Sequence, residues 1–360
     1  MPLPSKRDRD LVRDRLLAWL SKQLPAGASP AISRLDVPEG TGMSSETFLF
    51  DAGWTEAGAA RRGRYVVRLS PNMDDFPVFP EYDLSLQVGC LNLVAAHSDV
   101  PVPRVAWHEP DPGILDYPFY VMERVEGRVP PDLPPYLFAG WVVEATPEER
   151  AALRHHTLAT LAKLHAIDVT GPDAAFLDRP RYGATALEQH LACQRAYYDW
   201  ARDGVAYPVI ERTFAWLEKH RPDDPRPPCL NWGDSRIGNI LYRGFEPAAV
   251  LDWEMACLGA PEVDLAWMCE MHDFFQAMAE AVGLPGLPDL LPREAVIEEY
   301  EALSGRRVEH FDWYYTFAAL RFGIVSIRTS VRAIAYGQME PNDDPDALIT
   351  NKIILERCLG

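Results

Sequence analysis

The sequence predicts an α+β chain with two lobes: a small N-terminal lobe with an antiparallel sheet (residues 1–125) and a larger, mainly helical C-terminal lobe (residues 126–360). Strand-like apolar runs separated by turn residues fill much of the first lobe, whereas long segments with helical periodicity and capping patterns follow residue 145. A chain of 360 residues is long enough to form two lobes with a sizeable core.

The N-terminal lobe is expected to begin with an amphipathic helix over residues 8–22, because its apolar residues repeat on one helical stripe. A strand follows at residues 64–69, and a second helix is expected to begin near Pro80. Residues 100–105 are predicted to form an edge strand that two prolines make stiff. Residues 118–122 are predicted to form a buried strand that leaves the lobe as a linker.

The C-terminal lobe is predicted from its helix signals. Residues 130–135 are rich in proline and read as a surface connection. Residues 146–149 form a capping box with Pro at the first helical position, which opens a helix that ends near residue 166. Further helices are expected over residues 185–200, which Thr185 with Glu188 opens in the same way, and over 209–220 and 312–337, the last with one continuous apolar seam.

Composition limits the possible classes of protein. The charged fraction of 24% is typical of a soluble globular chain, and no apolar stretch reaches roughly 18 residues, so a cytoplasmic protein without membrane contact is expected. The net charge of −18 disfavours nucleic acid as a partner and leaves open either a cationic substrate or an ordinary acidic protein. Six cysteines without a C-x-x-C pair indicate reduced thiols. The oligomeric state stays unknown.

One segment of the C-terminal lobe combines residue types that suit phosphoryl transfer from ATP. Asp234 and Asn239 lie five positions apart on a predicted turn, and Asp252 ends the next strand. Residues 241–243 and 248–251 are expected to form a hairpin that brings Asn239 and Asp252 to neighbouring strand ends. Asp234 would take the proton of the acceptor hydroxyl, and the other two would hold Mg²⁺ against the phosphates.

The alternative for these three residues is structural: Asp234 and Asn239 would shape a turn, and Asp252 would cap the next helix. That alternative is reasonable for each residue alone. It is disfavoured for all three at this order and spacing, because the combination meets the mechanical demands of the motif.

With the run G-D-x-R-x-G-N at residues 233–239 followed by D-W-E at 252–254, the chain resembles the aminoglycoside phosphotransferase and choline kinase-like family. More narrowly, it resembles the phosphotransferase domains that are fused to acyl-CoA dehydrogenases. The resemblance implies a bilobal protein-kinase-like fold, ATP and Mg²⁺ as cofactors, and a hydroxylated small molecule as acceptor. Family members usually carry His where this chain has Trp232, so support of the catalytic loop is expected from elsewhere.

The resemblance also implies a nucleotide clamp in the N-terminal lobe. Ser44 and Ser45 lie in a Gly- and Ser-bearing loop that could cover the phosphates, although such a loop is often just a hairpin. Arg68 stands where kinases place the Lys that reaches the phosphates, and a guanidinium can bind phosphate oxygens in a bidentate way. Glu81 is expected in the first turn of the second helix, where it could pair with Arg68. Alternatively, both are surface residues.

Further roles follow from the same resemblance. The linker residues Met122, Glu123, Arg124 and Val125 are candidates for backbone contact with the adenine edge. A core strand is the ordinary explanation of residues 119–122, and it holds whether or not adenine touches the end of that strand.

Two further acidic residues have expected roles near the catalytic loop. Glu254, two residues past Asp252, could reach Mg²⁺ through water or at a second site. Asp264 matches a family Asp and is expected to brace the catalytic loop.

Specificity is expected to come from the late helices. Arg321, Arg328 and Arg332 flank the apolar seam on a common side. If they line the acceptor cleft, they favour an anionic acceptor such as a carboxylate or a CoA phosphate. The alternative is a set of ordinary ion pairs at an acidic surface.

Together these features predict an ATP- and Mg²⁺-dependent small-molecule O-phosphotransferase with Asp234 as base. A nucleotide-binding pseudokinase that acts as a scaffold is the alternative, favoured by Trp232 and Arg68. A metal-dependent hydrolase built on Asp234, Asp252 and Glu254 is a third and weaker hypothesis, since it leaves Asn239 unexplained.

Overall fold

The computed structural model describes residues 7–38, 46–74 and 76–360. Its N-terminal part contains an antiparallel five-stranded sheet in the order β1-β2-β3-β5-β4. The strands are β1 (Ala31–Ile32), β2 (Glu46–Glu56), β3 (Ala59–Leu69), β4 (Val105–Glu109) and β5 (Phe119–Glu123).

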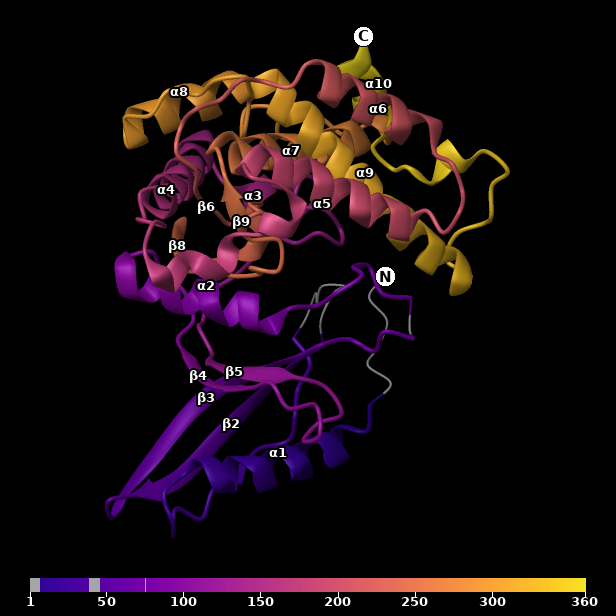
Figure 1. The fold of residues 1–360 in the computed structure, drawn as a ribbon. Coiled ribbons are helices and arrows are strands. Elements are labelled where there is room, and N and C mark those ends of the chain that lie inside the picture. Colours follow the sequence, from indigo (N-terminus) through magenta and orange to yellow (C-terminus); the bar gives the residue numbers. More distant parts are fainter. Residues whose placement is uncertain (1–6, 39–45, 75) are drawn as a thin grey trace.

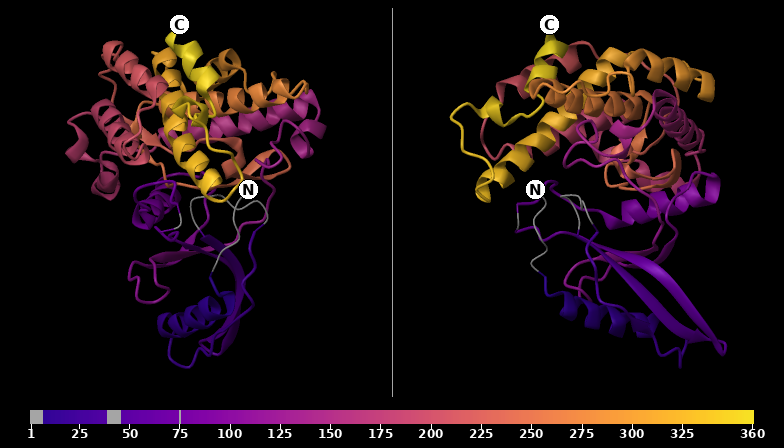
Figure 2. Two further views of the ribbon diagram at one scale, coloured as in Figure 1. Left: turned by 90° about the vertical axis from the view of Figure 1, so that its right-hand side faces the viewer. Right: turned by 180° about the vertical axis from the view of Figure 1, so that it is seen from behind.

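Two helices cover this sheet on opposite faces (Figure 1). α1 (Arg9–Gln23) is capped by Asp8 and packs its apolar stripe on the outer face, where the rings of Trp19 and Phe119 lie 4.8 Å apart. α2 (Leu84–His97) lies between the sheet and the remaining helices, and its apolar residues belong to the same core as the C-terminal part. The two halves of the chain are therefore joined by a shared core. Figure 2 shows the arrangement of the two halves from two further sides.

Two predicted boundaries in this part are wrong. α2 begins at Leu84 rather than near Pro80, because Asp83 caps it by accepting a hydrogen bond from the Leu86 N–H. The edge strand β4 spans Val105–Glu109 rather than residues 100–105, since prolines cannot donate to the ladder and the Pro-rich run precedes the paired residues.

The C-terminal part is mainly helical, as predicted. Its helices are α3 (Trp141–Glu144), α4 (Pro147–His165), α5 (Ala186–Ala201), α6 (Pro208–Lys219), α7 (Glu262–Ala281), α8 (Arg293–Ser304), α9 (Phe311–Ala335) and α10 (Lys352–Leu359). Short 3₁₀ turns are η1 (Pro172–Leu177), η2 (Pro180–Tyr182), η3 (Ile237–Asn239) and η4 (Pro345–Leu348). Both predicted capping boxes, Thr146 with Glu149 and Thr185 with Glu188, are present at the starts of α4 and α5.

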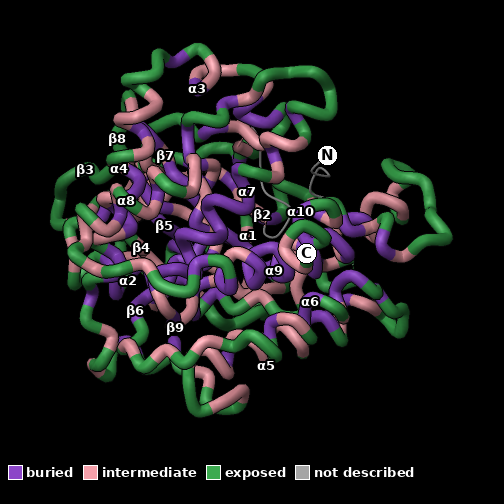
Figure 3. The backbone as a smooth tube through the Cα atoms, turned by 90° about the horizontal axis from the view of Figure 1, so that it is seen from above, coloured by how far each residue is buried: buried purple, intermediate pink, exposed green. Residues whose placement is uncertain are grey.

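α7 and α9 form the centre of this part, and Figure 3 shows their buried segments enclosed by more exposed ones. Two small antiparallel ladders lie between them and the sheet: β6 (Cys229–Asn231) with β9 (Cys257–Gly259), and β7 (Ile240–Arg243) with β8 (Glu246–Val250). The β7–β8 pair is the hairpin that the sequence predicts. No helix in the described ranges has the length and apolar character needed to span a membrane.

Candidate active site

The loop from β6 to η3 carries Asp234 and bends sharply at Gly233. Gly233 has a φ of +90°, and a Cβ there would overlap the carbonyl oxygen of Met255. Only glycine fits both the angle and the space. The loop therefore lies directly against the segment that follows Asp252.

Asp264 braces this loop from the first turn of α7. Its side chain is fully buried and accepts hydrogen bonds from the backbone N–H groups of Trp232 (2.8 Å) and Gly233 (2.7 Å). Ser235 Oγ donates to the Asp264 carbonyl (2.7 Å), and His165 Nε2 lies 3.1 Å from Asp264 Oδ2. These contacts agree with the bracing role expected for Asp264.

Trp232 also supports the loop, which corrects the expectation that this support comes from elsewhere. Its indole Nε1 donates to the backbone carbonyls of Leu251 (2.7 Å) and Asp252 (3.2 Å). The side chain is fully buried. Trp232 cannot copy a His hydrogen-bond pattern, but its longer side chain reaches carbonyls next to Asp252 and so joins the two segments that carry Asp234 and Asp252.

The Asp234 carboxylate is held at both oxygens. Trp267 Nε1 donates to Oδ1 (2.7 Å) and Asn239 Nδ2 donates to Oδ2 (2.7 Å). Arg236 Nε lies 3.3 Å from Oδ1, and its guanidinium pairs mainly with Asp132. The Asp234 side chain keeps 13% of its surface exposed, so its carboxylate is fixed in direction yet reachable.

Asn239 and Asp252 are neighbours at the ends of β7 and β8, as predicted. The Leu251 N–H donates to the Asn239 carbonyl (2.9 Å). Because Asn239 Nδ2 faces Asp234, Oδ1 is the amide atom that can bind a metal ion. Asp252 adopts a φ of +63°, which turns its carboxylate toward the N-terminal sheet.

Arg68 of β3 meets that carboxylate. Its Nη2 donates to Asp252 Oδ1 (2.6 Å) and lies 3.7 Å from Glu254 Oε2. Burial opposes the charge of Arg68, but Asp252 and Glu254 outweigh burial and raise the pKa of its guanidinium. Arg68, Asp252 and Glu254 therefore form one site from both parts of the chain.

The predicted pairing of Glu81 with Arg68 is wrong. Glu81 is 77% exposed and lies 3.8 Å from Arg181. The reason is the later start of α2, which leaves Glu81 in the preceding segment instead of a helical turn. Ser44 and Ser45 lie outside the described residues.

The four linker residues lie at the end of β5. Met122 is buried, and the N–H groups of Glu123 and Arg124 donate to the carbonyls of Arg104 and Arg64. These two N–H groups are already bonded within the sheet. Among the four linker residues, the Val125 N–H is therefore the candidate donor to a ligand.

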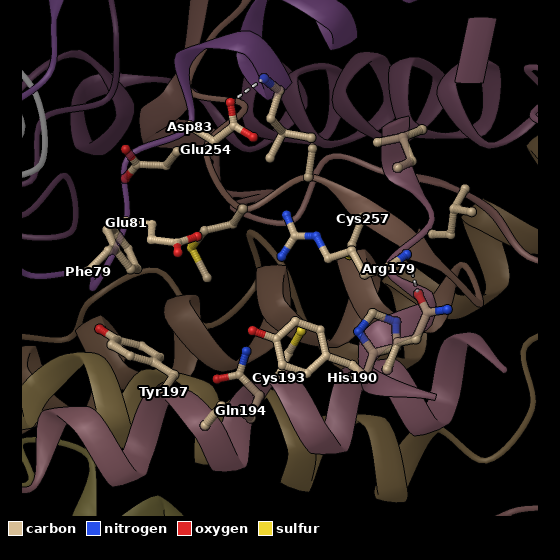
Figure 4. A pocket seen from close by; sticks show the side chains of 18 of the residues that line it. Phe79, Glu81, Asp83, Arg179, His190, Cys193, Gln194, Tyr197, Glu254 and Cys257 are labelled. Atoms are coloured by element: carbon tan, nitrogen blue, oxygen red, sulfur yellow. Dashed lines mark hydrogen bonds between the residues drawn. The ribbon is translucent and has the colours of Figure 1, made fainter. Parts of the chain in front are cut away.

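A cavity of about 670 Å³ lies beside the segment that follows Asp252, which packs against the Asp234 loop (Figure 4). It lies between the segment before α2, the η1–η2 region, α5, the residues after Asp252, and α9. Its polar lining includes Arg179, His190, Gln194, Glu254 and Arg321.

The three arginines of α9 do not share one environment, contrary to expectation. Arg321 is 3% exposed, lines the cavity and donates through Nη2 to the Gly233 carbonyl (2.9 Å). Arg328 instead donates to the Pro77 carbonyl (3.2 Å) and stacks on Trp200. Arg332 is half-buried and lies near the C-terminal end of the helix. Helical periodicity places all three on related faces but cannot tell which segment packs against each.

Sequence reasoning missed Trp267, His190 and Gln194. Trp267 lies in the same helix as Asp264, and nothing in its spacing indicates that its indole N–H reaches Asp234. His190 and Gln194 are four residues apart on α5 and so share a face, which is the one signal that could have linked them.

A metal cluster of carboxylates is not part of this site. Among residues 7–38, 46–74 and 76–360, no group of three or more His, Cys, Asp or Glu side chains could hold a metal ion. One amide oxygen and one carboxylate still suit Mg²⁺, which takes its remaining ligands from water and phosphates.

A loop with a held carboxylate, a neighbouring Asn and Asp on a hairpin, and a basic residue from an antiparallel sheet define a protein-kinase-like phosphotransferase fold. The family model described as "Phosphotransferase enzyme family" (APH) matches residues 42–295. The chain belongs to this family.

Named relatives agree with the assignment. The Arabidopsis thaliana protein "Probable acyl-CoA dehydrogenase IBR3" is 30% identical over 315 residues, which are 81% of this chain and 35% of that protein. The chain thus spans about a third of the length of the curated relatives it matches, 35% and 30% for the first two.

Solved structures show the same fold. A candidate aminoglycoside phosphotransferase from Ralstonia eutropha has a TM-score of 0.66 and 22% identity, with 96% of each chain covered. A thermostable mutant of aminoglycoside phosphotransferase APH(4)-Ia, in a ternary complex with AMP-PNP and hygromycin B, has a TM-score of 0.56 and 16% identity; 95% of this chain and 98% of that one are covered.

Proposed function

We propose that the protein transfers the γ-phosphoryl group of ATP to a hydroxyl group of a small molecule. The observation that carries this proposal is the Asp234 carboxylate, fixed by Trp267 and Asn239 beside the hairpin ends that bear Asn239 and Asp252. The structural relative with bound AMP-PNP and hygromycin B supports the same pairing of a nucleotide with a hydroxylated acceptor.

In this reaction Asp234 accepts the proton of the acceptor hydroxyl, whose oxygen forms a bond to the γ-phosphorus. The bond between that phosphorus and the oxygen bridging to the β-phosphate breaks, and ADP leaves with the electron pair. Because Asp234 is already directed by two hydrogen bonds, it needs little rearrangement to take the proton.

Asn239 Oδ1 and the Asp252 carboxylate are the proposed Mg²⁺ ligands. Glu254 lies close enough to Arg68 to offset part of the positive charge of its guanidinium. Mg²⁺, when bound, neutralises charge on the phosphate oxygens. Arg68 is proposed to move from Asp252 to a phosphate oxygen when nucleotide binds, since its guanidinium already lies at the boundary between sheet and hairpin. Val125 and its neighbours are proposed to contact adenine through the backbone, and Ser44 and Ser45 to contact the phosphates.

ADP release measured with Mg·ATP and a panel of hydroxylated compounds tests this function. Release that depends on both the acceptor and Asp234 supports it. Tight ATP binding without ADP release for any acceptor would instead favour the pseudokinase alternative. One observation favours that alternative: Arg68 donates to Asp252 Oδ1, an oxygen that the proposed Mg²⁺ site needs.

A further inference from the structure

Arg321 is a buried cation with an unused donor. Its Nη2 donates to the Gly233 carbonyl (2.9 Å), and its guanidinium lies 4.5 Å from the centre of the Trp267 ring. Its Nη1 atom is buried and has no hydrogen-bond partner anywhere in the described part of the chain. Burial removes the guanidinium from water and lowers the pKa of Arg321. A buried donor of this kind calls for an anionic partner.

The acidic side chains of the same cavity wall already have partners. Asp83 accepts from the Leu86 N–H (3.0 Å), and Asp178 accepts from Gln189 Nε2 (2.7 Å). Glu254 lies 3.7 Å from Arg68, and Glu81 lies 3.8 Å from Arg181. The unmatched charge in this cavity is therefore positive, despite the net charge of −18.

Two neutral side chains on α5 each carry one buried atom that is not hydrogen-bonded within the described ranges. His190 Nε2 and Gln194 Oε1 are buried atoms without a hydrogen bond to any described residue. Figure 4 shows both side chains rising from α5 into the cavity. Burial and the nearby charge of Arg321 lower the pKa of His190 to about 3, so its ring is neutral. Both atoms suit hydroxyl groups of a ligand.

Arg321 also lies next to the proposed chemistry. It binds the carbonyl of the residue before Asp234, and it stacks on the same indole that donates to Asp234 Oδ1. A ligand with one anionic group on Arg321 would therefore lie beside the loop that carries Asp234.

We infer that the acceptor is a carboxylic acid with several hydroxyl groups, bound with its carboxylate on Arg321 Nη1 and with hydroxyl groups on His190 and Gln194. This inference rests on the proposed phosphotransferase function and specifies its substrate class. The cavity volume of about 670 Å³ is in the usual range for small-molecule sites.

The test compares three compounds with one carbon skeleton and different charge: gluconate, the neutral polyol glucitol and the cationic glucamine. ADP release from Mg·ATP gives kcat/KM for each, and shorter hydroxycarboxylates are compared with their matching diols. We expect the carboxylates to exceed the neutral compounds by about 10²-fold, the usual effect of a buried charge pair. Equal or better turnover of glucitol or glucamine, or failure of every carboxylate to bind, overturns the inference.

Arg321→Met should reduce this preference to a few-fold. Arg328→Met is the matched control, because Arg328 lies seven residues further along the same helix and also stacks on a Trp but does not line the cavity. If Arg321→Met does not fold, the same comparison is made with Arg321→Lys. This variant keeps the positive charge and should keep the preference for gluconate. An unchanged preference in folded Arg321→Met, or its loss in folded Arg321→Lys alongside an unchanged control, contradicts the inference.

Binding is measured separately by the gluconate-dependent rise in melting temperature of the Asp234→Asn variant with ADP. Gluconate binding that depends on Arg321, with no ADP release by the parent for any acceptor, would remove the phosphotransferase function and retain the anion site. ADP release with neutral acceptors alone would retain the phosphotransferase function and remove the anion site.

Discussion

Asp234 and Trp232 take their roles from hydrogen bonds that residue identity alone does not reveal. Both oxygens of Asp234 accept hydrogen bonds, one from an indole and one from an amide. Trp232 joins the Asp234 loop to the Leu251 carbonyl beside Asp252. The two residues thus place the proposed base and the proposed metal ligand in one rigid unit.

Asp234→Asn should lower kcat by roughly 10²–10⁴-fold and leave nucleotide affinity nearly unchanged, because a positioned base contributes about that much. Steady-state kinetics with an active acceptor and calorimetry with ADP measure the two quantities. Turnover within a few-fold of the parent would remove Asp234 from this role.

Trp232→Phe should lower the free energy of unfolding by about 1–3 kcal/mol, because the partly buried hydrogen bond from the indole to the Leu251 carbonyl is lost. Urea unfolding measures the change. Trp216→Phe is the control, since Trp216 is only partly buried on α6. Equal stability of Trp232→Phe and the parent would show that the indole hydrogen bond is not needed.

At the scale of elements, the β7–β8 hairpin positions the proposed metal ligands. The Asn239 carbonyl accepts from the Leu251 N–H, so the two strand ends cannot separate without losing that bond. Arg68 reaches the same strand end from β3. A change at Asp252 should therefore affect nucleotide binding rather than the fold of the hairpin.

Asp252→Ala should abolish the dependence of ATP affinity on Mg²⁺, because the metal links this carboxylate to the phosphates. Calorimetry with and without Mg²⁺ checks this. Glu246→Ala at the exposed start of β8 should behave like the parent. The same Mg²⁺ dependence in Asp252→Ala and the control would place the metal elsewhere.

The sequence predicted elements whose signals are local, and it failed where the partner is distant. Capping boxes and the hairpin depend on residues a few positions apart, and both occur as predicted. The predicted pairing of Glu81 was wrong because the start of α2 depends on the Asp83 cap. The apolar repeat of a helix predicts that the helix exists but does not locate its first residue. For Arg321 the sequence left open a cleft edge or a surface ion pair, because its burial depends on packing between α9, Gly233 and Trp267.

At the scale of the whole molecule, a buried carboxyl group joins three helices of the C-terminal core. Glu270 of α7 accepts from Asn351 Nδ2 (2.8 Å), and Asn351 also donates to the Ala319 carbonyl of α9. Glu270 Oε2 and Asn351 Oδ1 are both buried without a partner among the described residues. Burial raises the pKa of Glu270 to about 8, which favours its protonated form.

This group should make the protein less stable as pH rises. The unfolded chain loses the Glu270 proton above about pH 4.5, whereas the native state keeps it up to about pH 8. The contribution of Glu270 to stability is therefore complete below about pH 4.5 and is lost between about pH 4.5 and pH 8. The slope should be about 1.4 kcal/mol per pH unit. Glu270→Gln should remove this slope in urea unfolding measured across the window, whereas parallel pH profiles of variant and parent would mean that Glu270 is ionised in the native state.

The transfer of phosphate itself tests the central claim most directly. Protein incubated with γ-³²P-labelled ATP, Mg²⁺ and gluconate should move label from ATP to the polyhydroxylated acid in a reaction that Asp234→Asn slows by roughly 10²-fold or more. Label that stays on ATP or appears only as inorganic phosphate, with gluconate and with every other hydroxylated compound of the panel, would contradict it.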